Sequence, residues 1–120
     1  MSGPRIPEIE DYRFGKVRVS GKEYRKDVII LPDGKVRSWW RKEGHRLCLE
    51  DLEDVIQHSP EVIVIGTGAY GIMRVPEEVI KELSKRGIRI VVKKTRDACD
   101  HFNELIKTEK RVAAALHLTC

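Results

Sequence analysis

The pattern of apolar and polar residues changes character near the middle of the chain. Over residues 14–19, Val17 and Val19 fall on one side of an extended segment and Lys16 and Arg18 on the other. This two-residue period is typical of a strand with one buried face. The first half of the chain therefore predicts strands, which short turns join in antiparallel fashion.

Two further strands are expected in the first half. Residues 24–31 end in a continuous apolar run, and a Pro-Asp-Gly turn signal separates them from a strand over residues 36–41. The two-residue period of a strand places Trp39 and Trp40 on opposite faces. One tryptophan is therefore expected in the core and the other on the surface, between arginines.

The second half alternates apolar strands with amphipathic helices. Strands are expected over residues 61–65 and 88–92, and the unit they form with the helix between them implies a parallel pair joined by a right-handed crossover. Residues 111–119 fit either a helix or a final antiparallel strand. Three helices are expected: one from Leu49 to Ile56, one that Pro76 opens and Gly87 ends, and one capped by Thr95 or Asp97 that reaches Ile106.

This alternation predicts an α/β fold, with helices covering the sheet and an antiparallel N-terminal portion. At 120 residues the chain is expected to form a single domain, residues 1–120. No apolar run approaches the roughly 20 residues that span a bilayer, and Met1–Arg5 lacks the apolar core of a signal peptide. The three cysteines are odd in number and widely spaced, which disfavours a disulfide framework. We therefore expect a cytoplasmic protein that does not interact with membranes.

Charge and amide content add two expectations. The chain has one Asn and one Gln, while 35% of its residues are charged, a balance that favours a thermophilic source. Residues 1–50 carry 12 basic and 8 acidic side chains, so the whole net charge of +4 lies there. Because acids alternate with these bases, we expect a solvated surface, and single-stranded nucleic-acid binding is only the weakest alternative.

A glycine loop follows the apolar strand at residues 61–65. Residues 66–71 read Gly-Thr-Gly-Ala-Tyr-Gly and match the G-x-G-x-x-G pattern of dinucleotide-binding loops. Four residues then separate the loop from Pro76, whereas a dinucleotide site needs the helix to begin inside the motif. Two glutamates follow Pro76, where they would repel phosphate, and lysines end the next strand, where an NAD site needs an acid. We therefore favour a tight structural turn and expect no cofactor.

Two loops are expected to share one edge of the sheet. Parallel strands at residues 61–65 and 88–92 send their following loops to the same side, where α/β sheets usually bind ligands. The expected crevice for a small molecule or anion contains Gly66, Thr67, Gly68, Tyr70, Gly71, Thr95 and Arg96. The alternative is structural, with Thr95 as a helix cap and Arg96 in solvent.

A second cluster follows the expected strand at residues 36–41. An exposed tryptophan beside Arg41 and His45 could anchor a partner protein, because Trp and Arg dominate interface energetics. We expect Trp39, Trp40, Arg41 and His45 to form an interaction surface. The alternative is structural, with a packed tryptophan pair and a hydrogen-bonded His45. The Cys and His spacings are not those of zinc sites, so no metal is expected, and no catalytic constellation is visible.

Short motifs in a fixed order give the chain a family resemblance over residues 12–120. They are Tyr12-x-Phe14-Gly15, Gly21-x-x-Tyr24-x-x-Asp27, Trp40-Arg41-x-x-Gly44-His45, Gly66-Thr67-Gly68, Thr95-x-x-Ala98, Asn103 and the final segment from Arg111 to His117 with Thr119 and Cys120. The chain resembles the small domain-of-unknown-function family that includes archaeal and bacterial hypothetical proteins, the adipogenesis-associated human protein and a mitochondrial complex I assembly factor.

The resemblance has implications for fold and for function. It implies a three-layer arrangement around a mixed sheet, with helices on both faces, an extra antiparallel N-terminal hairpin, and a strand at residues 111–117. It also implies an assembly or regulatory role through protein contacts. We therefore expect a non-enzymatic interaction module with an unidentified protein partner, or a homodimer. The alternative is a small-molecule or anion-binding protein, or an enzyme, with its site in the loops at residues 66–71 and 95–96.

Overall fold

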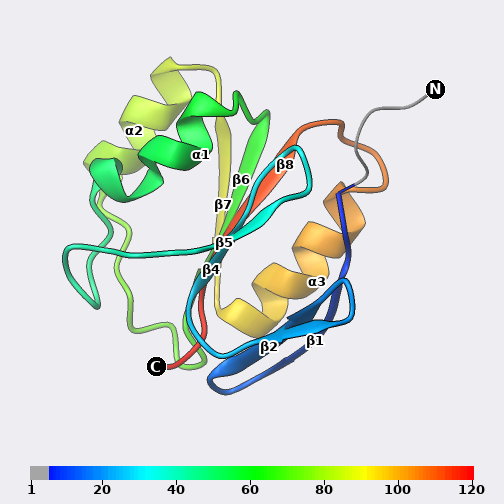
Figure 1. Ribbon diagram of the computed structural model, residues 1–120. Helices are drawn as coiled ribbons and strands as arrows, with labels where there is room; N and C mark the ends of the chain where they lie inside the picture. The colour runs from blue at the N-terminus through cyan, green and yellow to red at the C-terminus, as the bar shows by residue number, and fades with distance from the viewer. Residues whose placement is uncertain (1–5) are drawn as a thin grey trace.

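The computed structural model describes residues 6–120 and arranges them in two sheets with flanking helices (Figure 1). A three-stranded antiparallel sheet has the order β1 (Ile9–Arg13), β2 (Lys16–Val19), β3 (Lys22–Tyr24). A mixed five-stranded sheet has the order β5 (Val36–Ser38), β4 (Val28–Ile30), β8 (Val112–His117), β6 (Val62–Thr67), β7 (Arg89–Lys93). The helices are the 3-10 helix η1 (Leu49–Leu52) and the α-helices α1 (Glu53–Gln57), α2 (Glu77–Lys85) and α3 (Thr95–Leu105). The segment Met1–Arg5, on which the signal-peptide argument rests, lies outside the described residues.

The central strands β6 and β8 are buried along their whole length. Their side chains alternate between two hydrophobic clusters, one on each face of the sheet. Val62 and Val64 belong to the first cluster, and Ile63 and Ile65 to the second. Because both faces are covered, these strands appear in the sequence as continuous apolar runs rather than as alternating patterns.

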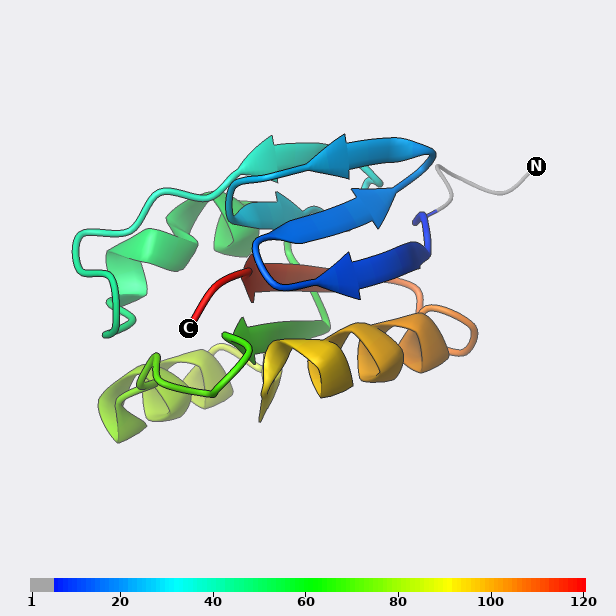
Figure 2. The same ribbon diagram turned by 90° about the horizontal axis from the view of Figure 1, so that it is seen from below.

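Different elements cover the two faces of the large sheet. Phe102 of α3 and Tyr12 of β1 pack in the first cluster, so α3 and the small sheet cover that face. Leu52 of η1 and Leu83 of α2 pack in the second cluster. Figures 1 and 2 show α3 and the small sheet on one side of the large sheet and α1 and α2 on the other. The three-layer α/β arrangement is confirmed, and the extra N-terminal hairpin is a three-stranded sheet.

The two crossovers explain why α2 and α3 lie on opposite faces. The chain passes from β6 through α2 to β7, which is its parallel neighbour. It then returns through α3, past β6, to β8 on the other side. Right-handed crossovers that run in opposite directions along a sheet put their helices on opposite faces. The predicted strand–helix–strand unit is therefore confirmed.

The final strand resolves the ambiguity of residues 111–119. Residues Val112–His117 form β8, as the family resemblance implies. This strand pairs antiparallel with β4 and parallel with β6. It therefore lies in the middle of the sheet, where no helix could replace it.

Several predicted boundaries in the first half were wrong. Residues 14–19 do not form one strand, because Phe14 and Gly15 make the turn between β1 and β2, and Gly15 has φ +76°. The expected strand at residues 24–31 is interrupted at residues 25–27, where the chain leaves the small sheet and enters the large one. The strand expected over 36–41 ends at Ser38.

The helical predictions hold more closely. Residues 49–57 form η1 followed by α1, and Gly87 ends α2 with φ +76°, a conformation that favours glycine. Among residues 6–120, none of the helices combines the length and the apolar composition that crossing a bilayer requires.

Candidate functional site

Three chain segments meet at the carboxyl end of the parallel strands. Gly66 of β6 pairs with Lys93 of β7, and Thr67 of β6 pairs with His117 of β8. The loops after β6 and β7 therefore reach the same edge, as predicted. Residues 118–120, which follow β8, arrive there as well, and the sequence analysis did not foresee this third segment.

The glycines of the loop at residues 66–71 allow close packing of these segments. A Cβ atom on Gly66 would lie 2.8 Å from the hydroxyl oxygen of Thr95. A Cβ atom on Gly68, which has φ +105°, would lie 2.5 Å from the carbonyl oxygen of Cys120. These two positions need glycine because backbone and side chains from elsewhere in the chain approach them.

Thr95 is fully buried and connects the three segments. Its hydroxyl accepts a 2.8 Å hydrogen bond from the Gly68 amide and donates a 2.6 Å hydrogen bond to the His117 carbonyl. The predicted cap of α3 by Thr95 or Asp97 was wrong, since the N-cap residue is Lys94 and no side chain caps it. The Thr95 hydroxyl is not free for capping because it bonds the loop and β8 instead.

The remaining crevice residues point in different directions. The Thr67 hydroxyl donates to the Lys93 carbonyl at 3.1 Å, while Tyr70 is 66% exposed. Arg96 donates to the Tyr12 carbonyl at 3.3 Å, and its guanidinium lies over the Tyr12 ring. The structure thus brings the expected residues to one edge but engages many of their polar groups internally. Anion binding there stays a prediction.

The second predicted cluster separates into buried and exposed members. Trp39 is 5% exposed, and its indole N–H donates to the Asp51 carbonyl at 2.9 Å. Trp40 is 76% exposed. The sequence predicted one buried and one exposed tryptophan, and Trp39 is the buried one.

The loop at residues 39–48 is fastened to the rest of the molecule by hydrogen bonds. The Asp51 carboxylate accepts from the Lys42 amide at 3.2 Å and from the Cys48 amide at 2.8 Å. The Arg74 amide donates to the His45 carbonyl at 2.8 Å. These contacts attach the loop to η1 and to the segment before α2, although several of its side chains face solvent.

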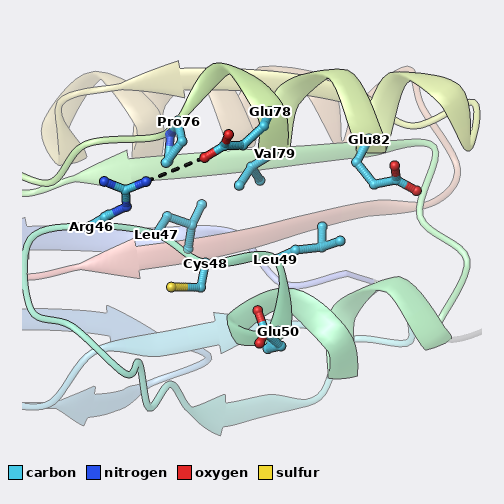
Figure 3. A pocket seen from close by; sticks show the side chains of 9 residues that line it. All are labelled: Arg46, Leu47, Cys48, Leu49, Glu50, Pro76, Glu78, Val79 and Glu82. Carbon is cyan, nitrogen blue, oxygen red and sulfur yellow. Dashed lines mark hydrogen bonds and ion pairs between the residues drawn. The ribbon is translucent and has the colours of Figure 1, made fainter.

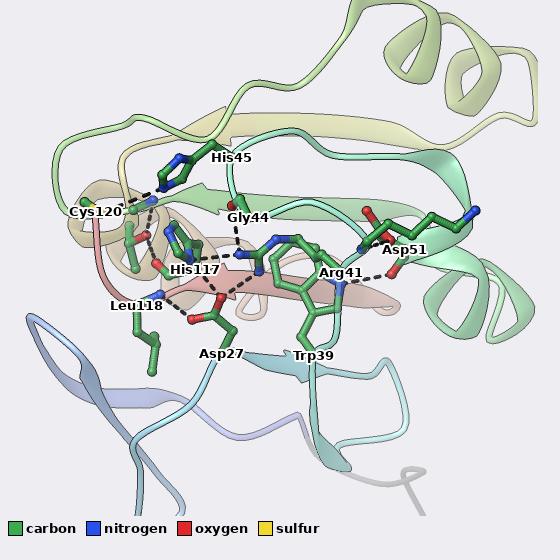
Figure 4. Close-up of polar contacts among 12 residues, drawn as sticks. Asp27, Trp39, Arg41, Gly44, His45, Asp51, His117, Leu118 and Cys120 are labelled. Carbon is green, nitrogen blue, oxygen red and sulfur yellow. Dashed lines mark hydrogen bonds and ion pairs between the residues drawn. The ribbon is translucent and has the colours of Figure 1, made fainter.

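Arg41, the third member of the cluster, is buried in a charged group with Asp27 and His117. Arg41 Nη1 lies 2.6 Å from Asp27 Oδ2, and the exposed fraction of the Arg41 side chain is only 6% (Figure 4). Its guanidinium stacks over the Trp39 ring at 4.6 Å, and Nη2 donates to the Gly44 carbonyl. Arg41 therefore joins the start of β4, the 39–48 loop and β8.

The Asp27 carboxylate accepts hydrogen bonds from three directions. His117 Nδ1 lies 2.7 Å from Oδ2, and the Leu118 amide donates to Oδ1 at 2.8 Å. Burial raises the pKa of this carboxyl, but the hydrogen bonds from His117, the Leu118 amide and Arg41 outweigh burial, so the pKa lies below its usual value. Asp27 is therefore a carboxylate at neutral pH.

The contacts of His117 indicate which ring nitrogen donates to Asp27. Nδ1 lies 2.7 Å from Asp27 Oδ2 and 3.1 Å from Arg41 Nη2. Because a guanidinium only donates and a carboxylate only accepts, we assign the shorter contact as an N–H donated by Nδ1 to Asp27. Nε2 is then the other ring nitrogen, and this buried atom has no hydrogen-bond partner among the described residues.

His45 and Cys120 lie beside this charged group. The Cys120 sulfur is 3.8 Å from His45 Nε2, and the His45 and His117 rings meet edge to face with centroids 6.1 Å apart. Sequence reasoning missed Asp27, His117 and Cys120 as members of one site. The available signal was that all three occur in the family motifs, together with Arg41 and His45.

A groove lies on a different surface, between α2 and the segment that leads into η1 (Figure 3). Two adjacent hollows of about 400 and 320 Å³ share Leu49 and Glu50 in their walls. The charged residues that line them are Arg46, Glu50, Glu53, Glu78, Glu82 and Arg86. Three of the four glutamates form ion pairs, Glu50 with Lys42, Glu78 with Arg46 and Glu82 with Arg86. Glu53 is the one lining carboxylate without an ion pair among the described residues.

Candidate metal ligands do not gather in the described structure. Within residues 6–120, no three His, Cys, Asp or Glu side chains are placed to hold one metal ion together. The chemical groups at the carboxyl end of the parallel strands are hydrogen-bonding groups, the Cys120 thiol and the imidazoles of His45 and His117.

Comparison with known proteins identifies relatives over most of the chain. The NADH dehydrogenase [ubiquinone] 1 alpha subcomplex assembly factor 3 of Danio rerio is 51% identical over 100 residues, which are 81% of this chain and 55% of that protein. The protein of the same name from Homo sapiens is 28% identical over 111 residues, or 90% of this chain and 59% of that protein. The chain thus spans less than two thirds of the length of these curated relatives.

Solved structures share the fold. A conserved hypothetical protein from Pyrococcus horikoshii OT3 has a TM-score of 0.85 and 31% identity, covering 94% of this chain and 99% of that one. A protein described as an outer membrane protein from Bartonella henselae has a TM-score of 0.82 and 28% identity, covering 99% and 100%. A family model described as "Protein of unknown function (DUF498/DUF598)" matches residues 9–117. The chain therefore belongs to the DUF498/DUF598 family, in agreement with the order of its motifs.

Proposed function

We propose that this protein is an interaction module that binds a protein partner through Trp40 and assists the assembly of a multi-subunit complex. The observation that carries the proposal is the 76% exposure of Trp40 on a loop that is otherwise fastened in place. A large aromatic side chain held in solvent is the usual anchor of a protein interface.

The two residues that flank Trp40 hold its backbone in place before a partner binds. Trp39 is buried on one side of it, and Arg41 is buried in the charged group on the other. Both flanking side chains therefore fix the backbone that carries Trp40. A partner would lose little conformational freedom of this loop on binding, which favours affinity.

The groove beside α2 follows the Trp40 loop along the chain. The loop that displays Trp40 continues into residues 46–50, which form one wall of the groove. Leu47 and Val79 supply apolar lining, while glutamates outnumber arginines around it. We expect the partner to place an apolar side chain in this groove, with a basic residue facing Glu53.

The relatives support the assembly role. Two proteins similar to this chain are named as assembly factors of NADH dehydrogenase, and the shared region covers most of this chain. A cytoplasmic or other reducing compartment suits the protein, because Cys48, Cys99 and Cys120 are all unpaired.

A photo-crosslinking residue in place of Trp40 tests the interaction directly. In cells of the source organism, this variant is expected to give a discrete covalent adduct, which mass spectrometry identifies as a subunit of a complex or as a second copy of the chain. The same residue in place of Val92, an exposed apolar position on β7, is the matched control. Equal adducts at both positions, or none at position 40, would refute the interaction.

Deletion and rescue test the assembly role. We expect cells without the protein to accumulate partly assembled NADH dehydrogenase on native gels. The natural chain and Val92→Ala should restore assembly, whereas Trp40→Ala should not. Full rescue by Trp40→Ala, or normal complex in the deletion strain, would contradict the proposal.

A further inference from the structure

The three cysteines of the chain lie in different chemical environments. Cys99 is buried in α3, and burial, followed by the charge of Asp100, raises the pKa of its thiol to about 12. Burial and the neighbouring acids Asp51, Glu43 and Glu50 raise the pKa of the Cys48 thiol. Both thiols are therefore poor nucleophiles at neutral pH, because the thiolate is the reactive form.

Cys120, in contrast, lies next to the imidazole of His45. Its sulfur lies 3.8 Å from His45 Nε2, within the range of a hydrogen bond that involves sulfur. Its side chain is partly exposed. A thiol next to an imidazole can transfer its proton to the ring and become a nucleophilic thiolate.

The backbone around Cys120 is held by three hydrogen bonds from two other segments, the turn between β1 and β2 and the loop after β6. The Gly15 amide donates to the Leu118 carbonyl at 2.8 Å, and the Ala69 amide donates to the Thr119 carbonyl at 2.6 Å. The Ile72 amide donates to the Cys120 carbonyl at 3.2 Å. These bonds keep the thiol next to His45, which a cysteine in a free tail would not achieve.

A second, independent feature of the site is the unpartnered nitrogen of His117. The His117 side chain is 7% exposed, and Nε2 has no hydrogen-bond partner among the described residues. Figure 4 shows this nitrogen on the side of the ring that faces His45, while Nδ1 faces Asp27. A buried ring nitrogen without a partner, next to a Cys–His pair, leaves a hydrogen-bonding position that the described residues do not fill.

Two exposed aromatic side chains lie next in sequence to the residues that hold the segment at 118–119. The rings of Phe14 and Tyr70 lie 6.0 Å apart, and both side chains are more than half exposed. Phe14 precedes Gly15, and Tyr70 follows Ala69, the two residues whose amides hold the segment at 118–119. Exposed apolar residues therefore flank the segment that carries Cys120.

We infer that Cys120 is a thiol-exchange site at which a low-molecular-weight disulfide forms a mixed disulfide with the protein, with His45 as the base. The Cys120 thiol gives its proton to His45 Nε2, and the thiolate attacks one sulfur of the disulfide. A bond forms between Cys120 and that sulfur while the original S–S bond breaks. The released thiolate takes the proton from the His45 imidazolium and leaves as a thiol, so atoms and electrons balance.

Oxidised glutathione, added to the full reduced chain at pH 7, is the probe. Intact-mass spectrometry and peptide mapping are expected to show one glutathionyl group, on Cys120, acquired at least about tenfold faster than on Cys48. Cys120→Ser should abolish this uptake, and the matched controls Cys48→Ser and Cys99→Ser should leave its rate unchanged. Reaction of Cys48 as fast as Cys120 would overturn the inference.

His45→Gln tests the role of the imidazole. At pH 7 we expect the rate of Cys120 modification to fall about tenfold. At about pH 10, where thiols ionise without assistance, the variant should react as fast as the natural chain. An unchanged rate at pH 7, or an equal loss at both pH values, would overturn the assignment of His45 as the base. Circular dichroism of the variant verifies that it is folded.

Discussion

The guanidinium of Arg41 and the carboxylate of Asp27 form a buried ion pair, with Arg41 Nη1 2.6 Å from Asp27 Oδ2, across 14 positions of sequence. Asp27 lies just before β4, and Arg41 lies in the loop that displays Trp40. The pair therefore connects the sheet to the proposed interaction surface. His117, at the end of β8, contacts both residues.

Asp27→Asn should destabilise the fold at neutral pH. The substitution leaves the Arg41 charge buried without its counter-ion, which costs about 3 kcal/mol or more in the free energy of unfolding. Urea denaturation at pH 7 measures the loss. Asp11→Asn, which removes an exposed carboxylate paired with Arg13, is the control and should change stability by less than about 0.5 kcal/mol. Similar losses for both variants would contradict the importance of the buried pair.

The contribution of Asp27 should depend on pH in a defined direction. Burial raises its pKa, but the hydrogen bonds outweigh burial and leave the folded-state pKa below the unfolded value. A lowered carboxyl pKa stabilises the fold above the unfolded value of about 3.9, and this contribution is lost as pH falls through the folded-state pKa. The stability difference between the natural chain and Asp27→Asn should therefore be full at pH 7 and shrink at low pH. A difference that stays constant down to pH 2 would contradict this account.

Truncation to alanine should reduce the stability of the fold strongly at Trp39 and hardly at all at Trp40. Trp39→Ala removes a buried ring, its hydrogen bond to Asp51 and its contact with Arg41, so unfolding should become easier by about 3–5 kcal/mol. Trp40→Ala removes an exposed side chain and should change stability by less than about 0.5 kcal/mol. Thermal and urea unfolding of both variants provide the comparison. A large loss for Trp40→Ala would mean that this residue is structural rather than an interaction anchor.

The central part of the fold can be predicted from sequence because burial on both faces leaves a distinctive pattern. The apolar run of β6 and the helical periodicity of α2 and α3 are local signals, and their alternation implies a parallel pair. β8 is harder to predict, since its alanines favour a helix in isolation and only its position between β4 and β6 requires a strand. The short strands β1 and β3 lack a clear periodic signal, and β1 was not predicted.

The candidate site could be predicted only in part because its members are far apart in sequence. The shared edge of β6 and β7 follows from their parallel pairing, and the loops after both strands reach it. The contact between Asp27 and His117 joins positions 90 residues apart, and nothing local indicates it. Sequence alone also could not show that Thr95 bonds Gly68 and His117 instead of capping α3.

Gly68→Ala should destabilise the fold by more than the cost of placing a non-glycine residue at a positive φ. The residue has φ +105°, and the new Cβ would lie 2.5 Å from the Cys120 carbonyl oxygen. Gly21→Ala is a matched control, because Gly21 has φ +75° and open space around it. We expect about 1–2 kcal/mol for Gly21→Ala and a clearly larger loss for Gly68→Ala. Equal losses in urea denaturation would show that the segment at residues 118–120 does not press against the loop.

Thr95→Val should weaken the attachment of the loop after β6 to the end of β8, because valine has nearly the shape of threonine but lacks the hydroxyl. The substitution removes the acceptor of the Gly68 amide and the donor to the His117 carbonyl, and both of these groups are buried. Buried backbone groups left without partners cost about 1–3 kcal/mol. Hydrogen exchange should also show faster exchange of the Gly68 amide in the variant.

Thr95→Ser is the control because it retains the hydroxyl and loses only a methyl group. We expect it to keep the slow exchange of the Gly68 amide and most of the stability. If Thr95→Ser lost as much stability as Thr95→Val, the methyl group rather than the hydroxyl would be the source of the effect. In that case the loop after β6 would be held to β8 by packing and not by the two hydrogen bonds of Thr95.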